Sequence, residues 1–311
     1  MKYRAFGDTG IEVSEIGIGC GGLGVERLAD AERSLNWAFD QGVTLYDTAV
    51  SYGDGKSEEL LGRAFAGRRD RIVLATKFGT VIRPDGTSYR DYSVTAMRQA
   101  FEISLCRLKT DYVDIYHLHN PPMSVLEDRE LWGALDGMLD DGRIRCYGLS
   151  IDDGPSACRF LDSTRGKGIQ ILANLFAQKD RPFFDEAARR RAGVIIKVPM
   201  AGGALTGRFS PDYPPPTDGR RRRWGEENFR WRLDLVEKVR PILENSGRTM
   251  AQGALAWLLS FDAVSAVIPG ISSVDKVKEV VGAAGLRLSA EEMRALDDLD
   301  GGVIRRLNLA W

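Results

Sequence analysis

The chain has 311 residues, which is longer than a typical domain but within reach of one α/β barrel of roughly 250 residues with insertions. Hydrophobic residues make up 43% and charged residues 28%, so a sizeable core can form and extensive disorder is not expected. The 43 Lys and Arg residues balance 44 Asp and Glu residues, and this near-neutral charge argues against nucleic acid or an anionic membrane as a partner. We expect a small-molecule partner, and no apolar run approaches the length of a membrane span.

The four cysteines are not arranged as a metal site or a disulfide framework. Cys20, Cys106, Cys146 and Cys158 form no CxxC pair and show no zinc spacing. The first residues of the chain also lack the apolar segment of a secretory signal. These features predict a cytoplasmic protein, and the sequence leaves open whether it is a monomer or a small homo-oligomer.

The first predicted element is a β-hairpin over residues 1–14. Two short strand-like runs, Tyr3–Phe6 and Ile11–Val13, flank the turn sequence Gly7-Asp8-Thr9-Gly10. Because this hairpin precedes the first strand of the predicted barrel described next, we expect it to plug the bottom of that barrel.

After the hairpin, short runs of β-branched and aromatic residues alternate with longer amphipathic segments. This alternation is typical of βα units around a parallel sheet, and eight units favour a closed (β/α)8 barrel, or TIM barrel, as a single domain over residues 1–311. The predicted strands are Glu15–Gly19, Thr44–Asp47, Ile72–Lys77, Val113–His119, Cys146–Ser150, Ile171–Leu175, Gly193–Val198 and Ala266–Pro269. The predicted helices include Asp30–Gln41, Ser57–Ala66, Ser93–Leu108, Leu126–Asp140 and Met250–Leu259.

A long loop after the seventh strand interrupts this alternation. Between about residues 202 and 247 lies a Pro-rich and basic segment, Pro211–Arg223, followed by a helix rich in Arg, Trp and Glu. The run Arg220–Arg223 is weak evidence for a nucleic-acid site, because Glu226 and Glu227 follow at once. Loops that follow barrel strands lie on the catalytic face, so we interpret this segment as a border of the active site.

Four polar residues end or follow the second, third and fourth predicted strands. Asp47, Lys77 and His119 end these strands, and Tyr52 follows the second one. The carboxyl ends of parallel barrel strands meet at one mouth, so we expect the four side chains to converge there as the catalytic group. A phenol with a pKa of about 10 donates a proton well at neutral pH only beside a cation, which Lys77 supplies. Asp47 can hold that cation, and His119 can hydrogen-bond a substrate oxygen beside Tyr52.

These residues resemble the pattern of the aldo-keto reductase superfamily. The matching segments are residues 45–53, which read Leu-Tyr-Asp-Thr-Ala-Val-Ser-Tyr-Gly, then Ala75-Thr76-Lys77 and His119-Asn120-Pro121, and the resemblance spans essentially the whole chain. It implies hydride transfer between an aldehyde or ketone and the nicotinamide of NADP(H), with NAD(H) as a possible cofactor. It also implies that the tyrosine is the general acid and base, assisted by the other three residues.

No G-x-G-x-x-G sequence opens a βα unit, so a dinucleotide would bind in another way than in a Rossmann fold. Barrels offer a phosphate site in the loops after strands seven and eight, where glycines allow close backbone approach and a capped helix start favours an anion. The predicted cofactor contacts are Pro199, Met200, Gly202, Leu205 and Gly207 after strand seven, Gly270, Ser272 and Lys276 after strand eight, Gly19, Cys20 and Gly21 after strand one, and Asp47.

The resemblance adds further cofactor positions and also exposes departures from the family pattern. Ser150 and Gln170 match residues that bind the nicotinamide carboxamide, and Glu279 matches an adenine contact. Lys197 stands where many members carry a Tyr stacked on the nicotinamide, and we assign it to the cofactor site as well. The remaining departures, each at a common Asn position, are Ile151 and Val280. The resemblance therefore specifies the reaction more firmly than the preference for NADP over NAD.

Two other interpretations fit parts of the sequence. His117-Leu118-His119 is also the HxH pattern of metal-dependent hydrolases, but the chain has only these two histidines. We therefore expect no metal site and a hydrogen-bonded His117 inside the barrel. The second alternative is a non-catalytic barrel that binds nicotinamide nucleotides as a redox sensor, and the intact Asp47, Tyr52 and Lys77 argue against it.

The substrate pocket is predicted to include Tyr52, His119 and Trp224, the last from the long loop. Trp231 and Trp311 are further aromatic candidates for contact with a sugar-like or aromatic compound. The sequence does not identify the carbonyl or alcohol substrate itself.

Overall fold

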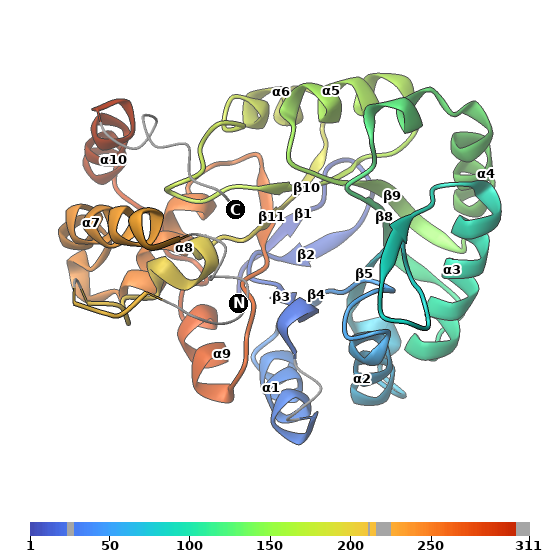
Figure 1. The fold of residues 1–311 in the computed structure, drawn as a ribbon, viewed down its shortest axis with the longest axis horizontal. Coiled ribbons are helices and arrows are strands. Elements are labelled where there is room, and N and C mark those ends of the chain that lie inside the picture. Colours follow the sequence, from blue (N-terminus) through green and yellow to red (C-terminus); the bar gives the residue numbers. More distant parts are fainter. Residues whose placement is uncertain (24–27, 211, 216–224, 303–311) are drawn as a thin grey trace.

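The computed structural model describes residues 1–23, 28–210, 212–215 and 225–302. Eight parallel strands form one nearly closed sheet in which neighbours along the chain are neighbours in space, and helices surround it (Figure 1). Isolated bridges between Ile16 and Val267, and between Gly19 and Gly270, join the first strand to the last. The barrel strands are β3 (Ile18–Gly19), β4 (Leu45–Asp47), β5 (Val73–Phe78), β8 (Val113–His119), β9 (Ile144–Ile151), β10 (Gly168–Leu172), β11 (Gly193–Lys197) and β12 (Val264–Val267). The predicted (β/α)8 barrel is thus confirmed.

The described helices begin at side-chain caps in several places. Ser93 caps α3, Asp128 caps α4 and Asp153 caps α5, while Thr249 and Gln252 form a capping box at α8. Such caps satisfy backbone N–H groups that the first helical turn leaves unpaired. The α-helices are α1 (Leu28–Asp40), α2 (Lys56–Ala64), α3 (Val94–Leu108), α4 (Arg129–Asp140), α5 (Gly154–Ser163), α6 (Phe183–Arg189), α7 (Gly225–Leu243), α8 (Met250–Leu259), α9 (Val274–Val281) and α10 (Ala290–Gly302).

The N-terminal hairpin plugs the barrel, as predicted. Strands β1 (Tyr3–Ala5) and β2 (Glu12–Ser14) pair antiparallel, and they lie within the ring of strands in Figure 1. The Phe6 side chain is fully buried in a cluster with inward-facing barrel residues, among them Leu45 and Ile115. Gly193 makes room for this ring, because a Cβ atom at that position would lie 2.4 Å from Phe6. The bottom of the barrel is therefore filled by side chains.

The structure differs from the predicted strands mainly at the sixth one. That strand was expected at residues 171–175, but β10 covers Gly168–Leu172. In this register the backbones of β9 and β10 pack closely, since a Cβ atom on Gly148 would lie 1.8 Å from the carbonyl oxygen of Gly168. As a result Gln170 lies within the strand, in register with Ser150 of β9. Sequence periodicity carries no signal for such a backbone contact.

A second hairpin, which the sequence did not predict, follows β5. Its strands are β6 (Thr80–Ile82) and β7 (Ser88–Arg90), and they pair antiparallel. Between β11 and β12 lie the 3-10 turn η5 (Ala201–Thr206) and the helices α7 and α8, in agreement with the predicted long insertion. Trp224, Trp311 and the run Arg220–Arg223 lie outside the described residues.

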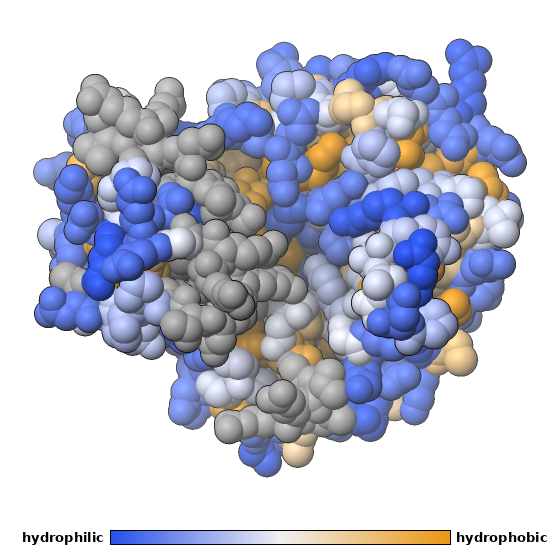
Figure 2. Space-filling view, in the orientation of Figure 1, coloured by the Kyte–Doolittle hydropathy of each residue, from blue (hydrophilic) through white to orange (hydrophobic). Residues whose placement is uncertain are grey.

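The face of the molecule seen in Figure 1 is mainly hydrophilic, and some hydrophobic residues are visible near its centre (Figure 2). Within the described ranges, no helix has the length and apolar character needed to cross a membrane.

Candidate active site

Polar side chains lie at the carboxyl ends of six neighbouring barrel strands, which we call the barrel mouth. Backbone register aligns them, since His119 pairs with Ser150 and Ser150 pairs with Gln170. Because parallel strands present their carboxyl ends on one side, these groups share one edge of the sheet. They are Asp47 on β4, Lys77 on β5, His119 on β8, Ser150 on β9, Gln170 on β10 and Lys197 on β11.

A buried ion pair joins Asp47 and Lys77. The Lys77 Nζ atom donates to Asp47 Oδ1 at 2.7 Å and to the Thr48 carbonyl oxygen at 2.6 Å, and neither charged side chain is more than 3% exposed. Burial lowers the pKa of Lys77, but the charge of Asp47 and the nearby Tyr52 raise it by more, so its pKa lies above the ordinary value. Lys77 is therefore an ammonium at neutral pH.

Tyr52 and His119 lie beside this ion pair. The Lys77 Nζ atom is 5.0 Å from the centroid of the Tyr52 ring, and the rings of Tyr52 and His119 meet edge to face with centroids 5.9 Å apart. Gly21 lets the tyrosine ring pack closely, because a Cβ atom there would lie 3.1 Å from it. Both rings are only partly buried. A phenol next to a fixed ammonium and an imidazole can exchange a proton with an oxygen bound at the mouth.

A chain of hydrogen bonds continues from Asp47 across the mouth. Gln170 Nε2 donates to Asp47 Oδ2 at 2.7 Å, Ser150 Oγ donates to Gln170 Oε1 at 2.8 Å, and Lys197 Nζ donates to Ser150 Oγ at 3.2 Å. The carboxylate can only accept, so the orientation of the Gln170 amide and of the Ser150 hydroxyl follows from it. Three residues predicted to bind cofactor are thus connected to the buried ion pair.

Lys197 at the end of β11 is held on three sides. Its Nζ atom pairs with an Asp152 carboxylate oxygen at 2.9 Å and donates to Asn120 Oδ1 at 3.2 Å, in addition to Ser150. Its side chain is 16% exposed, and burial lowers its pKa although Asp152 opposes this effect. An ammonium has three donor hydrogens, so these acceptors use all of them.

Two residues that the sequence did not single out hold the turn that follows β8. Tyr92 Oη contacts the carbonyl oxygens of His119 and Asn120 at 2.7 and 2.8 Å, and Arg90 Nη1 donates to the His119 oxygen at 2.9 Å. Asn120 has a φ of 51°, a left-handed conformation that few residues other than glycine adopt. The unpredicted β6–β7 hairpin brings Arg90 to this turn, so the sequence gave no indication of the contact.

His117 lies two residues before His119 on β8, on the same face of the strand, and it is fully buried. Neither ring nitrogen has a hydrogen-bond partner among the residues that the structure describes, so the expected hydrogen-bonded His117 is wrong. Burial, together with the nearby Lys77 and Lys197, holds its pKa well below the ordinary value, and the ring is neutral. In the described ranges, no group of three or more His, Cys, Asp or Glu side chains has the arrangement of a metal site.

The predicted phosphate contacts lie in two places. In and after η5, Gly202, Gly203 and Gly207 have φ values of 66°, 100° and 74°. The side chains of Met200 and Leu205 are buried in the core, so a ligand there would meet backbone rather than these side chains.

The second place is the start of α9, next to the bridge between Gly19 and Gly270. Ser273 caps this helix, and Lys276 Nζ donates to Ser272 Oγ at 2.5 Å. Cys20 is buried, Glu279 is half-buried on α9, and Val280 points into the core. Pro199 is also buried, and the predicted pocket residue Trp224 lies outside the described residues.

A parallel eight-stranded barrel with polar side chains at its mouth is the architecture of TIM-barrel enzymes. Residues 15–301 match the model of the aldo/keto reductase family, and the chain belongs to the aldo-keto reductase family of oxidoreductases.

Relatives and a solved structure agree with this assignment. The aldo-keto reductase yakc [NADP(+)] of Schizosaccharomyces pombe is 32% identical over 89% of this chain and 85% of its own length. The NADH-specific methylglyoxal reductase of Escherichia coli is 27% identical over 93% of this chain and 95% of its own. The structure of aldo-keto reductase AKR11C1 from Bacillus halodurans in its holo form matches with a TM-score of 0.83 and 29% identity over 96% of both chains.

Proposed function

We propose that the protein interconverts an aldehyde or ketone and the corresponding alcohol with a nicotinamide cofactor, and that Tyr52 transfers the proton. The observation that carries this proposal is the buried pair of Lys77 and Asp47 directly beside Tyr52. A buried charge is costly unless it is paired, and this pair presents an ammonium to the phenol of Tyr52, whose ring meets the His119 ring edge to face.

The residues at the mouth suit a nicotinamide dinucleotide. The positive φ values of Gly202, Gly203 and Gly207 allow backbone N–H groups to approach a pyrophosphate closely. At the start of α9, Ser272 and the exposed Lys276 can meet a 2′-phosphate. Ser150 and Gln170 would orient the nicotinamide carboxamide. When bound, the reduced nicotinamide supplies a hydride to the carbonyl carbon.

The proton in this reaction is handled by the chain itself. Tyr52 donates its phenolic proton to the carbonyl oxygen as the alcohol forms, and it takes that proton back in the reverse direction. Lys77, held as an ammonium by Asp47, stabilises the negative charge left on the Tyr52 oxygen. His119 holds the substrate oxygen beside the tyrosine. Asp47 acts on Lys77 rather than on the substrate, since both its oxygens are engaged by Lys77 and Gln170.

For the cofactor we propose NADP(H), with NAD(H) as a possible substitute. Lys276 and Ser272 favour the extra phosphate of NADP(H). The names of the two relatives differ on the cofactor, since one is named for NADP(+) and the other for NADH.

A fluorescence titration with NADPH and with NADH tests this proposal. We expect NADPH to bind, and we expect Lys276→Ala to weaken NADPH binding much more than NADH binding. Lys278→Ala is the matched control, because this lysine is also exposed on α9 and pairs only weakly with Asp275 at 3.5 Å. Binding of neither nucleotide would overturn the proposed function.

A further inference from the structure

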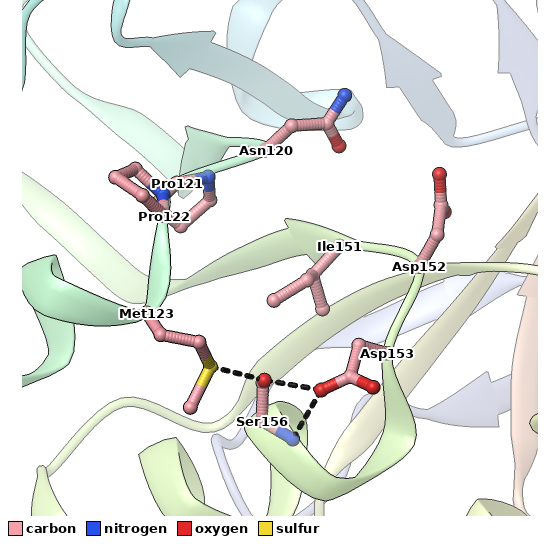
Figure 3. A pocket seen from close by; sticks show the side chains of 8 residues that line it. All are labelled: Asn120, Pro121, Pro122, Met123, Ile151, Asp152, Asp153 and Ser156. Carbon is pink, nitrogen blue, oxygen red and sulfur yellow. Dashed lines mark hydrogen bonds between the residues drawn. The ribbon is translucent and has the colours of Figure 1, made fainter.

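A pocket of about 350 Å³ opens beside the proposed catalytic residues, between the turns that follow β8 and β9 (Figure 3). It begins one residue beyond His119 and Ser150, which are paired in register, because Asn120 and Ile151 are part of its wall. To reach this pocket, a substrate whose carbonyl oxygen lies at His119 has to extend its remaining atoms past Asn120.

Two carboxylates are part of the wall, but Asp153 accepts from the backbone N–H and the hydroxyl of Ser156, so Asp152 is the less engaged of the two. The side chain of Asp152 is 50% exposed, and Figure 3 shows that it and the Asn120 amide reach into the same open space. One Asp152 oxygen pairs with Lys197, and the other has no hydrogen-bond partner among the described residues. Asp152, Asn120 and Ser150 occupy the three donor hydrogens of Lys197, so this ammonium has none left to donate to an anion. The pocket thus offers a carboxylate acceptor and repels negative charge.

The opposite part of the wall is apolar. Pro121, Pro122, Met123 and Ile151 form it, and their side chains carry no group that donates a strong hydrogen bond. Carbon-bound hydrogens of a ligand can pack on these surfaces while its hydroxyl groups face Asp152 and Asn120. A hydroxyl group can donate to the Asp152 oxygen and accept from the Asn120 amide, whereas an anion would meet the carboxylate and an alkyl chain would leave it without a ligand partner.

We propose that Asp152 is a specificity-determining residue that selects neutral, polyhydroxylated carbonyl compounds over anionic and alkyl ones. This inference rests on the proposed function, since it concerns the same reaction. A hydrogen bond to a charged acceptor contributes more than one between neutral groups, so the Asp152 carboxylate favours a ligand hydroxyl group over an alkyl group.

The test compares three four-carbon aldehydes in the intact enzyme with NADPH or NADH. Erythrose is hydroxylated and neutral, butanal is alkyl, and succinic semialdehyde is anionic. The kcat/KM value of each is divided by that of butanal within one variant, so changes common to all substrates cancel. Asp152→Asn keeps the shape and removes the charge. Asp140→Asn is the matched control, because Asp140 also pairs with a cation, Arg165 at 2.9 Å, but lies at the end of α4 away from the pocket.

We expect Asp152→Asn to lower the erythrose ratio about 10-fold and to raise the succinic semialdehyde ratio, while Asp140→Asn changes neither. Opposite changes for the hydroxylated and anionic substrates would not follow from a loosened fold. Turnover with both ratios unchanged in Asp152→Asn would overturn this inference and leave the proposed function standing. No turnover of any of the three aldehydes with either cofactor would overturn both.

Discussion

Removing the Asp47 carboxylate tests the energetic account of the buried ion pair. In Asp47→Ala, the fully buried Lys77 ammonium loses its carboxylate partner and keeps the Thr48 carbonyl oxygen, and Gln170 loses the acceptor of its Nε2 atom. Breaking a buried pair in this way costs about 3–5 kcal/mol, because a charge remains in the core without compensation. Total folding free energies are typically about 5–15 kcal/mol, so this single change should remove a large part of the stability.

Urea unfolding followed by circular dichroism measures this cost. The companion variant, Asp47→Ala combined with Lys77→Met, leaves no buried charge, and we expect it to be more stable than Asp47→Ala alone. A free energy of unfolding for Asp47→Ala within about 1 kcal/mol of the wild type, or a double variant that is less stable still, would refute the reasoning.

The pH dependence of this cost has a defined direction. The pKa of Lys77 is raised in the folded wild type, so its stabilisation is present below the unfolded pKa of about 10.4 and is lost as pH rises through the folded value. Without Asp47, burial lowers the pKa of Lys77, and the destabilised ammonium can release its proton. The difference in unfolding free energy between wild type and Asp47→Ala should therefore shrink between about pH 7 and pH 10.

Three further predictions concern single contacts. Tyr92→Phe removes the hydroxyl that holds the His119 turn, and we expect kcat/KM to fall about 5- to 30-fold with an unchanged cofactor dissociation constant; a change in cofactor binding alone would contradict this role. His117→Met replaces a buried neutral imidazole whose pKa is lowered in the folded protein. As pH falls from about 7.5 to about 5, the histidine is protonated more readily in the unfolded chain, so the free energy of unfolding measured with urea should fall more steeply for the wild type than for the variant. Gly193→Ala forces a methyl group against Phe6 and should cost about 1–3 kcal/mol in thermal unfolding, whereas an unchanged midpoint would mean that the plug is loosely packed.

The predicted catalytic residues came together because the parallel barrel places all strand ends on one side. For Asp47, Lys77 and His119, the only information needed was that each ends a strand, and short β-branched runs reveal this. The position of Tyr52 near the mouth could be predicted because this residue lies only five positions after Asp47 in the chain. Ser150 and Lys197 were instead assigned from the resemblance to the family, and the structure places both at the mouth.

Other features depend on contacts between distant parts of the chain. The register of β10 includes the close approach of Gly148 to Gly168, which lie far apart in the sequence. The hydrogen bond from Tyr92 to the His119 carbonyl oxygen depends on the orientation of the Tyr92 side chain. The ion pair of Lys197 with Asp152 joins β11 to the turn after β9, and these two strands are not adjacent in the sheet, so no local pattern predicts it. The lack of a hydrogen-bond partner for His117 among the described residues likewise depends on which side chains surround it in the barrel.

The central claim is that Tyr52 transfers the proton while Lys77 and Asp47 support it. Its most direct test is the initial rate of butanal reduction, followed by the loss of NADPH absorbance, for the wild type and for Tyr52→Phe. Tyr3→Phe is the control, because it removes an exposed hydroxyl on the N-terminal hairpin, far from the mouth. We predict that Tyr52→Phe binds NADPH with the wild-type dissociation constant and loses at least about 100-fold in kcat, whereas Tyr3→Phe retains the full rate. A Tyr52→Phe enzyme with NADPH bound and a wild-type rate would contradict the account.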